Sequence, residues 1–66
     1  MTLFEIKQAI HSGRRVFWNH QGYEVVYAPK ISEYLIKCHG NQNIIGLTWK
    51  DGVTMNGKPS EFFTNA

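Results

Sequence analysis

Hydrophobic residues recur at helical spacing over the first thirteen residues. One apolar stripe is formed by Leu3, Ile6 and Ile10. Thr2 and Glu5 have the spacing of a Thr-x-x-Glu capping box, in which each residue satisfies a backbone N–H group of the other at the start of a helix. The pattern therefore predicts an N-terminal helix, which Gly13 ends in a left-handed conformation.

The pattern then changes to the two-residue alternation of β-strands. Four segments are rich in valine, isoleucine and aromatic residues and are separated by turn-forming residues, so the expected strands are 15–18, 23–27, 33–38 and 43–49. The segment 53–55 is long enough only for an edge strand, and Pro59 argues against a central strand near it. We expect Phe62 and Phe63 to fold back over an open edge of the core.

The first hairpin has two possible registers. A two-residue turn places Val16 and Trp18 on the same face of the sheet as Tyr23 and Val25. A type I turn with a bulge at the following glycine shifts the second strand by one residue and pairs Phe17 with Val25. The sequence alone leaves both registers open.

The order of these elements predicts an α+β fold. One N-terminal helix packs on a four- to five-stranded antiparallel β-meander in two layers, and residues 1–66 form a single small domain. A helix of this length covers one face of the sheet, yet apolar residues point to both faces, as in Val16 beside Phe17 and Leu35 beside Ile36. We therefore expect either that the C-terminal segment covers the second face or that another molecule does, most simply a second copy in a homodimer.

Composition supports a folded domain and favours no strongly charged partner. The chain is 42% hydrophobic and 14% aromatic, which is too apolar for intrinsic disorder, and its net charge is only +2. Its single cysteine, Cys38, forms no internal disulfide, which fits a reducing cytoplasm. No apolar run reaches the length of a membrane span, and the first residues lack a secretory signal pattern. We expect a cytoplasmic protein with no membrane partner.

The residues that carry chemistry do not form a catalytic or metal-binding pattern. Cys38 and His39 are adjacent in a predicted strand, so their side chains point to opposite faces and do not form a thiolate–imidazole pair. The three histidines and the cysteine have no zinc-ligand spacing, and there is no glycine-rich phosphate loop. The expectation is a protein that is not an enzyme, with no catalytic residue, metal site or cofactor.

Aromatic residues and arginine dominate the energetics of protein interfaces, and they provide the candidate binding residues. For a protein partner these are Arg15, Trp18, Tyr23 and Trp49. A nucleic-acid partner is the alternative, because a cationic sheet with exposed aromatic residues binds single strands by charge and stacking. The candidate residues for that alternative are Arg14, Arg15, Lys30 and Lys37.

A pattern along nearly the whole chain resembles a group of small uncharacterised proteins of bacteriophages, prophages and related mobile elements. It comprises the run Gly46–Lys58 followed by Phe62-Phe63, and in the front half Ile6–Ile10, Val16-x-Trp18, Gly22-Tyr23-x-Val25 and Tyr34-Leu35-Ile36. The resemblance implies an accessory protein that acts by binding in the bacterial cytoplasm, and it implies no functional residues. The expected function is thus non-enzymatic binding of a protein partner or of a second copy, with nucleic-acid binding as the alternative.

Overall fold

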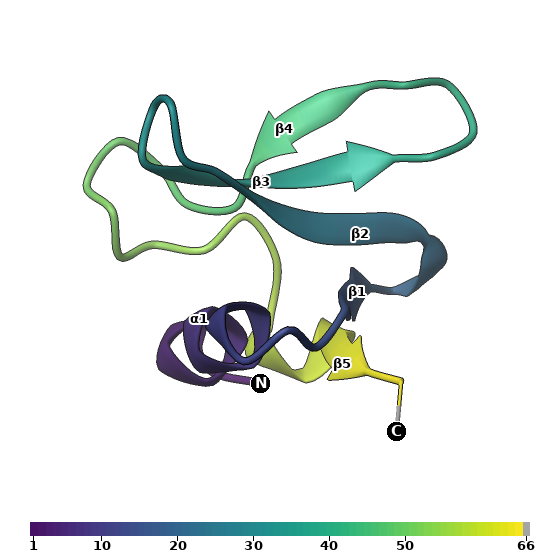
Figure 1. The fold of residues 1–66 in the computed structure, drawn as a ribbon, viewed down its shortest axis with the longest axis horizontal. Coiled ribbons are helices and arrows are strands. Elements are labelled where there is room, and N and C mark those ends of the chain that lie inside the picture. The colour runs from purple at the N-terminus through teal and green to yellow at the C-terminus, as the bar shows by residue number, and fades with distance from the viewer. Residues whose placement is uncertain (66) are drawn as a thin grey trace.

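A computed structural model describes residues 1–65, and residue 66 lies outside the described part. The elements in chain order are α1 (Leu3–His11), β1 (Val16–Trp18), β2 (His20–Ala28), β3 (Glu33–Cys38), β4 (Ile44–Gly46), a 3-10 turn η1 (Pro59–Glu61) and β5 (Phe62–Thr64). The strands form one antiparallel sheet in the order β4-β3-β2-β1-β5 (Figure 1). The predicted α+β fold with an N-terminal helix is confirmed.

The start and end of α1 follow the local sequence signals. Glu5 N donates to Thr2 Oγ1 at 3.2 Å, and Thr2 N donates to Glu5 Oε1 at 2.8 Å, which completes the predicted capping box. The last helical residue is His11, and Gly13 has a φ of +82°, a conformation that glycine adopts without steric cost.

The register of the first hairpin places Val16 and Val25 together on the helix side of the sheet. Val16 is the cross-strand partner of Val25, so the face assignment expected from a two-residue turn is confirmed. Phe17 pairs with Glu24, and the alternative pairing with Val25 is wrong. The connection is irregular, since the pairing shifts after Phe17 and β2 begins directly after Asn19, whose φ is +62°.

The second half of the sheet differs from expectation in two places. β4 ends at Gly46 rather than at residue 49, because the chain beyond it turns back on itself with Gly52 at φ +76°. The segment 53–55 forms an isolated bridge from Met55 to Thr48 instead of an edge strand. The fifth strand is β5, which pairs with β1 at the opposite edge and so places Phe62 and Phe63 where the core would otherwise be open.

The core lies between the sheet and a layer formed by α1 and the segment that follows β4. It joins residues from every part of the chain: Ile6, Ala9, Val16, Val25, Ile36, Leu47 and Phe62. Figure 1 shows this segment passing between α1 and the middle strands on its way to η1. Leu47, which it contributes, is fully buried, so the helix alone does not complete the layer.

The other face of the sheet has a different, partly charged composition. Phe17 is only 2% exposed there, because the Phe63 ring lies 5.6 Å from its own and the Arg15 guanidinium lies 5.3 Å from its centre. Glu24 and Lys37 continue the same cross-strand row. The side chain of Phe63 therefore shields Phe17 on this face, while β5 itself extends the sheet at its edge, and charged side chains occupy the centre of the face.

Candidate functional site

The segment between β4 and η1 forms a loop whose conformation is fixed by its own hydrogen bonds. At its tip the Asp51 carboxylate accepts bonds from Val53 N and Thr54 N, both at 2.9 Å, and from the Thr54 hydroxyl. The bonds from Thr54 are the main reason why the pKa of Asp51 lies below its ordinary value. Trp49 N donates to Thr54 O at 2.8 Å, so the two sides of the loop are joined above this tip.

This loop presents Trp49 to the surroundings in a fixed position. The indole is 62% exposed, yet its Nε1 donates to Asn56 Oδ1 at 2.7 Å. Asn56 also donates through Nδ2 to Gly46 O at 2.9 Å and through its backbone N to Leu47 O at 2.8 Å. A half-buried asparagine thus ties an exposed aromatic ring to the end of β4.

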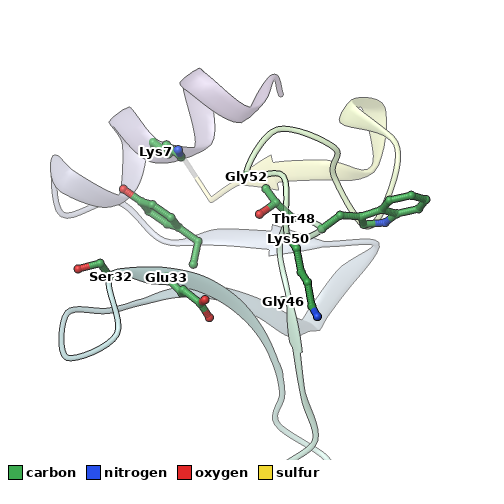
Figure 2. Close-up of a pocket in the computed structure, with 9 residues that line it drawn as sticks. Lys7, Ser32, Glu33, Gly46, Thr48, Lys50 and Gly52 are labelled. Atoms are coloured by element: carbon green, nitrogen blue, oxygen red, sulfur yellow. The ribbon is translucent and has the colours of Figure 1, made fainter.

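A cleft of about 340 Å³ lies beside Trp49. Its lining comes from α1, the start of β3 and the loop: Lys7, Ser32, Glu33, Tyr34, Gly46, Thr48, Trp49, Lys50 and Gly52. In Figure 2, Lys7 approaches from the helix, Ser32 and Glu33 lie at the β3 side, and Thr48 and Gly52 lie at the loop side. The lining offers two ammonium groups, one carboxylate and hydroxyl groups beside an exposed indole.

Contacts with Tyr34 hold the Lys7 ammonium group at the wall of the cleft. The Lys7 ammonium lies 5.2 Å from the centre of the Tyr34 ring, within cation–π range. A hydrogen bond links His11 Nε2 with the Tyr34 hydroxyl, and the Tyr27 ring lies 4.8 Å from that of Tyr34. Burial raises the pKa of Tyr34, so the phenol is neutral around pH 7 and the charge at this wall is that of Lys7.

The structure does not unite the four residues predicted to bind a protein partner. Trp18 and Tyr23 are half-buried on the helix side of the sheet, with ring centres 5.3 Å apart. Arg15 lies on the opposite face, and Trp49 stands alone in the loop after β4. Of the four, only Trp49 lines the cleft.

The four predicted nucleic-acid residues do not form one stripe either. Arg15 binds the Glu24 carboxylate through two nitrogen atoms, at 2.8 and 3.0 Å, and Lys37 is the cross-strand partner of Glu24. Arg14 donates to a threonine hydroxyl of β5, and Lys30 lies exposed in the turn between β2 and β3. An acidic side chain therefore stands between two of the four cations.

Glu24 is the centre of a small charge cluster on the open face of the sheet. His39 Nε2 lies 2.9 Å from Glu24 Oε1, the oxygen that also accepts from Arg15 Nη2. The hydrogen bonds from Arg15, and to a lesser extent from His39, hold the pKa of Glu24 below its usual value. The carboxylate is therefore ionised around pH 7 and offsets the cations around it.

Cys38 and His39 lie in different environments. The half-buried Cys38 lines a second, smaller cleft on the helix side with Trp18 and Tyr23, whereas His39 meets Glu24 on the other face. Within residues 1–65, no group of three or more His, Cys, Asp or Glu side chains is placed to hold a metal ion. In the same part of the chain, no helix has the length and apolar character needed to cross a membrane.

Sequence reasoning missed Asn56, Lys7 and Lys50 as parts of the site. Asn56 precedes Gly57, and this pair indicates a turn but not the bond to Trp49 seven residues earlier. Lys7 reads as a solvent-facing helical residue, and only the packing of α1 beside Tyr34 brings it to the cleft. The local signal that could have indicated an exposed aromatic residue near a cation is the pair Trp49-Lys50, which directly precedes the turn residues Asp51 and Gly52.

Comparisons of the chain with protein-family models, curated proteins and solved structures gave no match.

Proposed function

We propose that the chain is a non-enzymatic binding module that recognises a protein partner through Trp49 and the adjoining cleft. The observation that carries the proposal is the exposed indole of Trp49, which Asn56 holds in place. Tryptophan is among the residues that contribute most to protein interfaces. Because the ring is already fixed, binding would cost little side-chain entropy.

The surroundings of Trp49 suit an apolar segment that carries acidic residues. Val53, in the loop after Gly52, is 70% exposed. Ile31, which precedes the lining residue Ser32, is also exposed. Lys7 and Lys50 supply positive charge at the cleft, and Glu33 provides the one carboxylate that residues 1–65 contribute to its lining. Charge complementarity therefore favours a partner with an apolar side chain for Trp49 and carboxylates for the two lysines.

The lining also supports binding rather than catalysis. In the described part of the chain the lining contains neither histidine nor cysteine, and its hydroxyl groups and the Glu33 carboxylate do not provide a nucleophile with an activating base and an orienting third group. The setting that the sequence resemblance implies, a phage or prophage accessory protein in a bacterial cell, stays a prediction and guides the choice of material for the test.

The test is capture of bacterial proteins on the immobilised chain, with and without nuclease, compared between the wild type and Trp49→Ala. Phe4→Ala is the matched control, because Phe4 is an exposed aromatic residue that does not line the cleft. We expect specific proteins that the wild type and Phe4→Ala retain after nuclease treatment and that Trp49→Ala loses, with capture weakening at high salt.

Two results would overturn the proposal. Capture that is unchanged in a folded Trp49→Ala variant would show that the surface is wrong. Loss of all captured protein after nuclease treatment would favour the nucleic-acid alternative. The substitutions that test that alternative are Arg14→Ala, Arg15→Ala, Lys30→Ala and Lys37→Ala, each of which should reduce the salt dependence of binding.

A further inference from the structure

The two edges of the sheet differ in how they are protected. At one edge, β5 lies near α1, and the groove between them is lined by residues of both elements. The N-terminal ammonium also donates to Pro59 O just before β5. At the other edge, β4 is the last strand in the order, and its two isoleucines are 54% (Ile44) and 46% (Ile45) exposed. Sheet edges are usually guarded by charges, proline or a covering element, and β4 carries neither a charge nor a proline.

The backbone of β4 alternates between bonding β3 and facing outward. Asn43 O accepts from Cys38 N at 2.8 Å, and Leu47 N donates to Tyr34 O at 3.0 Å. Because bonding alternates along an antiparallel strand, the N–H and C=O groups of Ile44 and Gly46 face away from β3. The Gly46 carbonyl accepts one bond from Asn56 and has a second lone pair. The outward groups therefore fit another extended strand.

The row of cross-strand neighbours that faces the core is only partly covered where it ends at β4. Cross-strand partners form the row Thr64, Val16, Val25, Ile36 and Ile45, from β5 to β4. The residues in the middle of this row are buried, whereas Ile45 is nearly half exposed. Ile45 also forms one wall of the cleft of about 210 Å³ that Trp18, Tyr23 and Cys38 line. A further apolar residue beside Ile45 would extend both the row and this wall.

We propose that two copies of the chain pair through antiparallel β4 strands about a two-fold axis, with Ile45 facing Ile45 of the second copy. In this register the outward groups of Ile44 meet those of Gly46 in the other strand, and the two sheets join into one. The apolar row then continues across the axis. This surface shares Gly46 with the lining of the Trp49 cleft, but it uses the backbone of β4 and not the indole, so the dimer does not depend on the function proposed above.

A second copy fits this edge better than an unrelated charged strand. The chain around β4, residues 41–46, is uncharged, so two identical segments face each other without opposing like charges. The antiparallel arrangement is self-complementary, as a two-fold interface requires. Asn56 at Gly46 limits the pairing to about three residues of each copy. The area buried by so short a pairing falls well below the roughly 1,600 Å² of a stable interface. We therefore expect a weak dimer whose population rises with concentration.

Sedimentation velocity over a range of protein concentrations tests the proposal. We expect a shift from monomer toward dimer in the wild type, and a dissociation constant raised about tenfold or more in Ile45→Lys, because two ammonium groups would face each other. Val53→Lys, at a more exposed position outside the sheet, should leave the equilibrium unchanged. Ile44→Lys gives a second test at an exposed position if Ile45→Lys does not fold, as judged by circular dichroism.

A cysteine variant tests the register directly. In a Cys38→Ala background, Ile45→Cys should form an intermolecular disulfide under mild oxidation, because facing residues at the two-fold axis bring their Cβ atoms close together. Val53→Cys in the same background should remain monomeric. A wild type that is monomeric at every concentration, or a dimer unaffected by both lysine variants, would overturn the proposal. Trp49→Ala should leave dimerisation unchanged, which separates a failure here from a failure of the Trp49 surface.

Discussion

Trp49 and Asn56 are joined by a hydrogen bond of 2.7 Å from the indole Nε1 to the amide Oδ1, and the same amide reaches back to the Gly46 carbonyl. Through this bond the half-buried Asn56 side chain fixes the orientation of the exposed indole ring. It links the loop that carries Trp49 to the end of β4. The position of the proposed binding surface thus depends on a residue that need not touch the partner.

Replacing Asn56 by alanine should loosen the loop and lower the stability of the domain. The variant loses the bond to the indole and the bond to the Gly46 carbonyl, and each such bond contributes about 0.5–1.5 kcal/mol, so we expect a loss of about 1–2 kcal/mol in the free energy of unfolding. Urea denaturation measures that loss, and hydrogen exchange of the Trp49 indole N–H measures its exposure.

Asn65→Ala is the matched control for this prediction. Asn65 also accepts a side-chain bond, from Gln21 Nε2 at 3.2 Å, but it is exposed and follows β5, at the edge of the sheet opposite β4. Its replacement should change the free energy of unfolding by less than about 0.5 kcal/mol. Equal effects of the two variants, or an unchanged indole exchange rate in Asn56→Ala, would contradict the role given to Asn56.

Gly57→Ala should destabilise the protein more than Gly13→Ala, although both glycines have positive φ values. A methyl group at Gly57 would lie 2.7 Å from Trp18 Nε1 and 3.3 Å from Phe62, whereas nothing lies within 4 Å of one at Gly13. Gly13→Ala therefore carries only the backbone cost of about 1–2 kcal/mol, and Gly57→Ala adds an overpacking cost of about 1–3 kcal/mol. Thermal unfolding of the two variants gives the comparison. Equal midpoints would show that the Trp18 side chain moves aside for the added methyl group without a cost in stability.

The parts of the fold that were predictable are those encoded by neighbouring residues. The capping box of Thr2 and Glu5 and the left-handed Gly13 are short-range signals, and the structure has both. The strand 33–38 was predicted to the residue, because turn-forming residues flank a clear alternation. The place of β5 beside β1 was not predicted, since a pairing across more than forty residues leaves no local pattern.

The candidate site was predictable only in part for the same reason. Trp49 was identified from its residue type, but its grouping with Arg15, Trp18 and Tyr23 assumed one shared surface. The sheet separates them, because Trp18 and Tyr23 face the core side and Arg15 the other. Lys7 joins Trp49 at the cleft through the docking of α1, which depends on the whole core rather than on either segment.

Phe63→Ala should cost more stability than Phe4→Ala. The Phe63 ring packs 5.6 Å from that of Phe17, which is buried although it lies on the side of the sheet opposite the helix, whereas Phe4 is exposed on α1. Losing the half-buried ring uncovers Phe17, so we expect a decrease of about 2 kcal/mol, against less than about 0.5 kcal/mol for Phe4→Ala. Chemical denaturation distinguishes the two, and a Phe63→Ala variant as stable as the wild type would mean that β5 adds nothing to this face.

Acidification should weaken the fold partly through Glu24. Its pKa is lower in the folded chain than the ordinary value of 4.5, chiefly because Arg15 donates to it. The unfolded chain therefore takes up a proton at this site before the folded one does. The stability that the site contributes is present above about pH 4.5 and is lost as the pH falls through the lower, folded-state pKa. Glu24→Gln should be less stable than the wild type at pH 7, and the difference should shrink toward pH 3.

The control for Glu24 is Glu33→Gln, a change at an exposed carboxylate at the start of β3. The free energy of unfolding of the three proteins, measured by urea denaturation from pH 7 to pH 3, isolates the contribution of the Arg15–Glu24–His39 cluster. His39→Ala should reproduce a smaller part of the Glu24→Gln effect, since Arg15 makes the dominant bonds. If Glu24→Gln kept the full acid sensitivity of the wild type, the cluster would be an exposed ion pair of little energetic consequence, and the charged centre of this face would be explained by solubility instead.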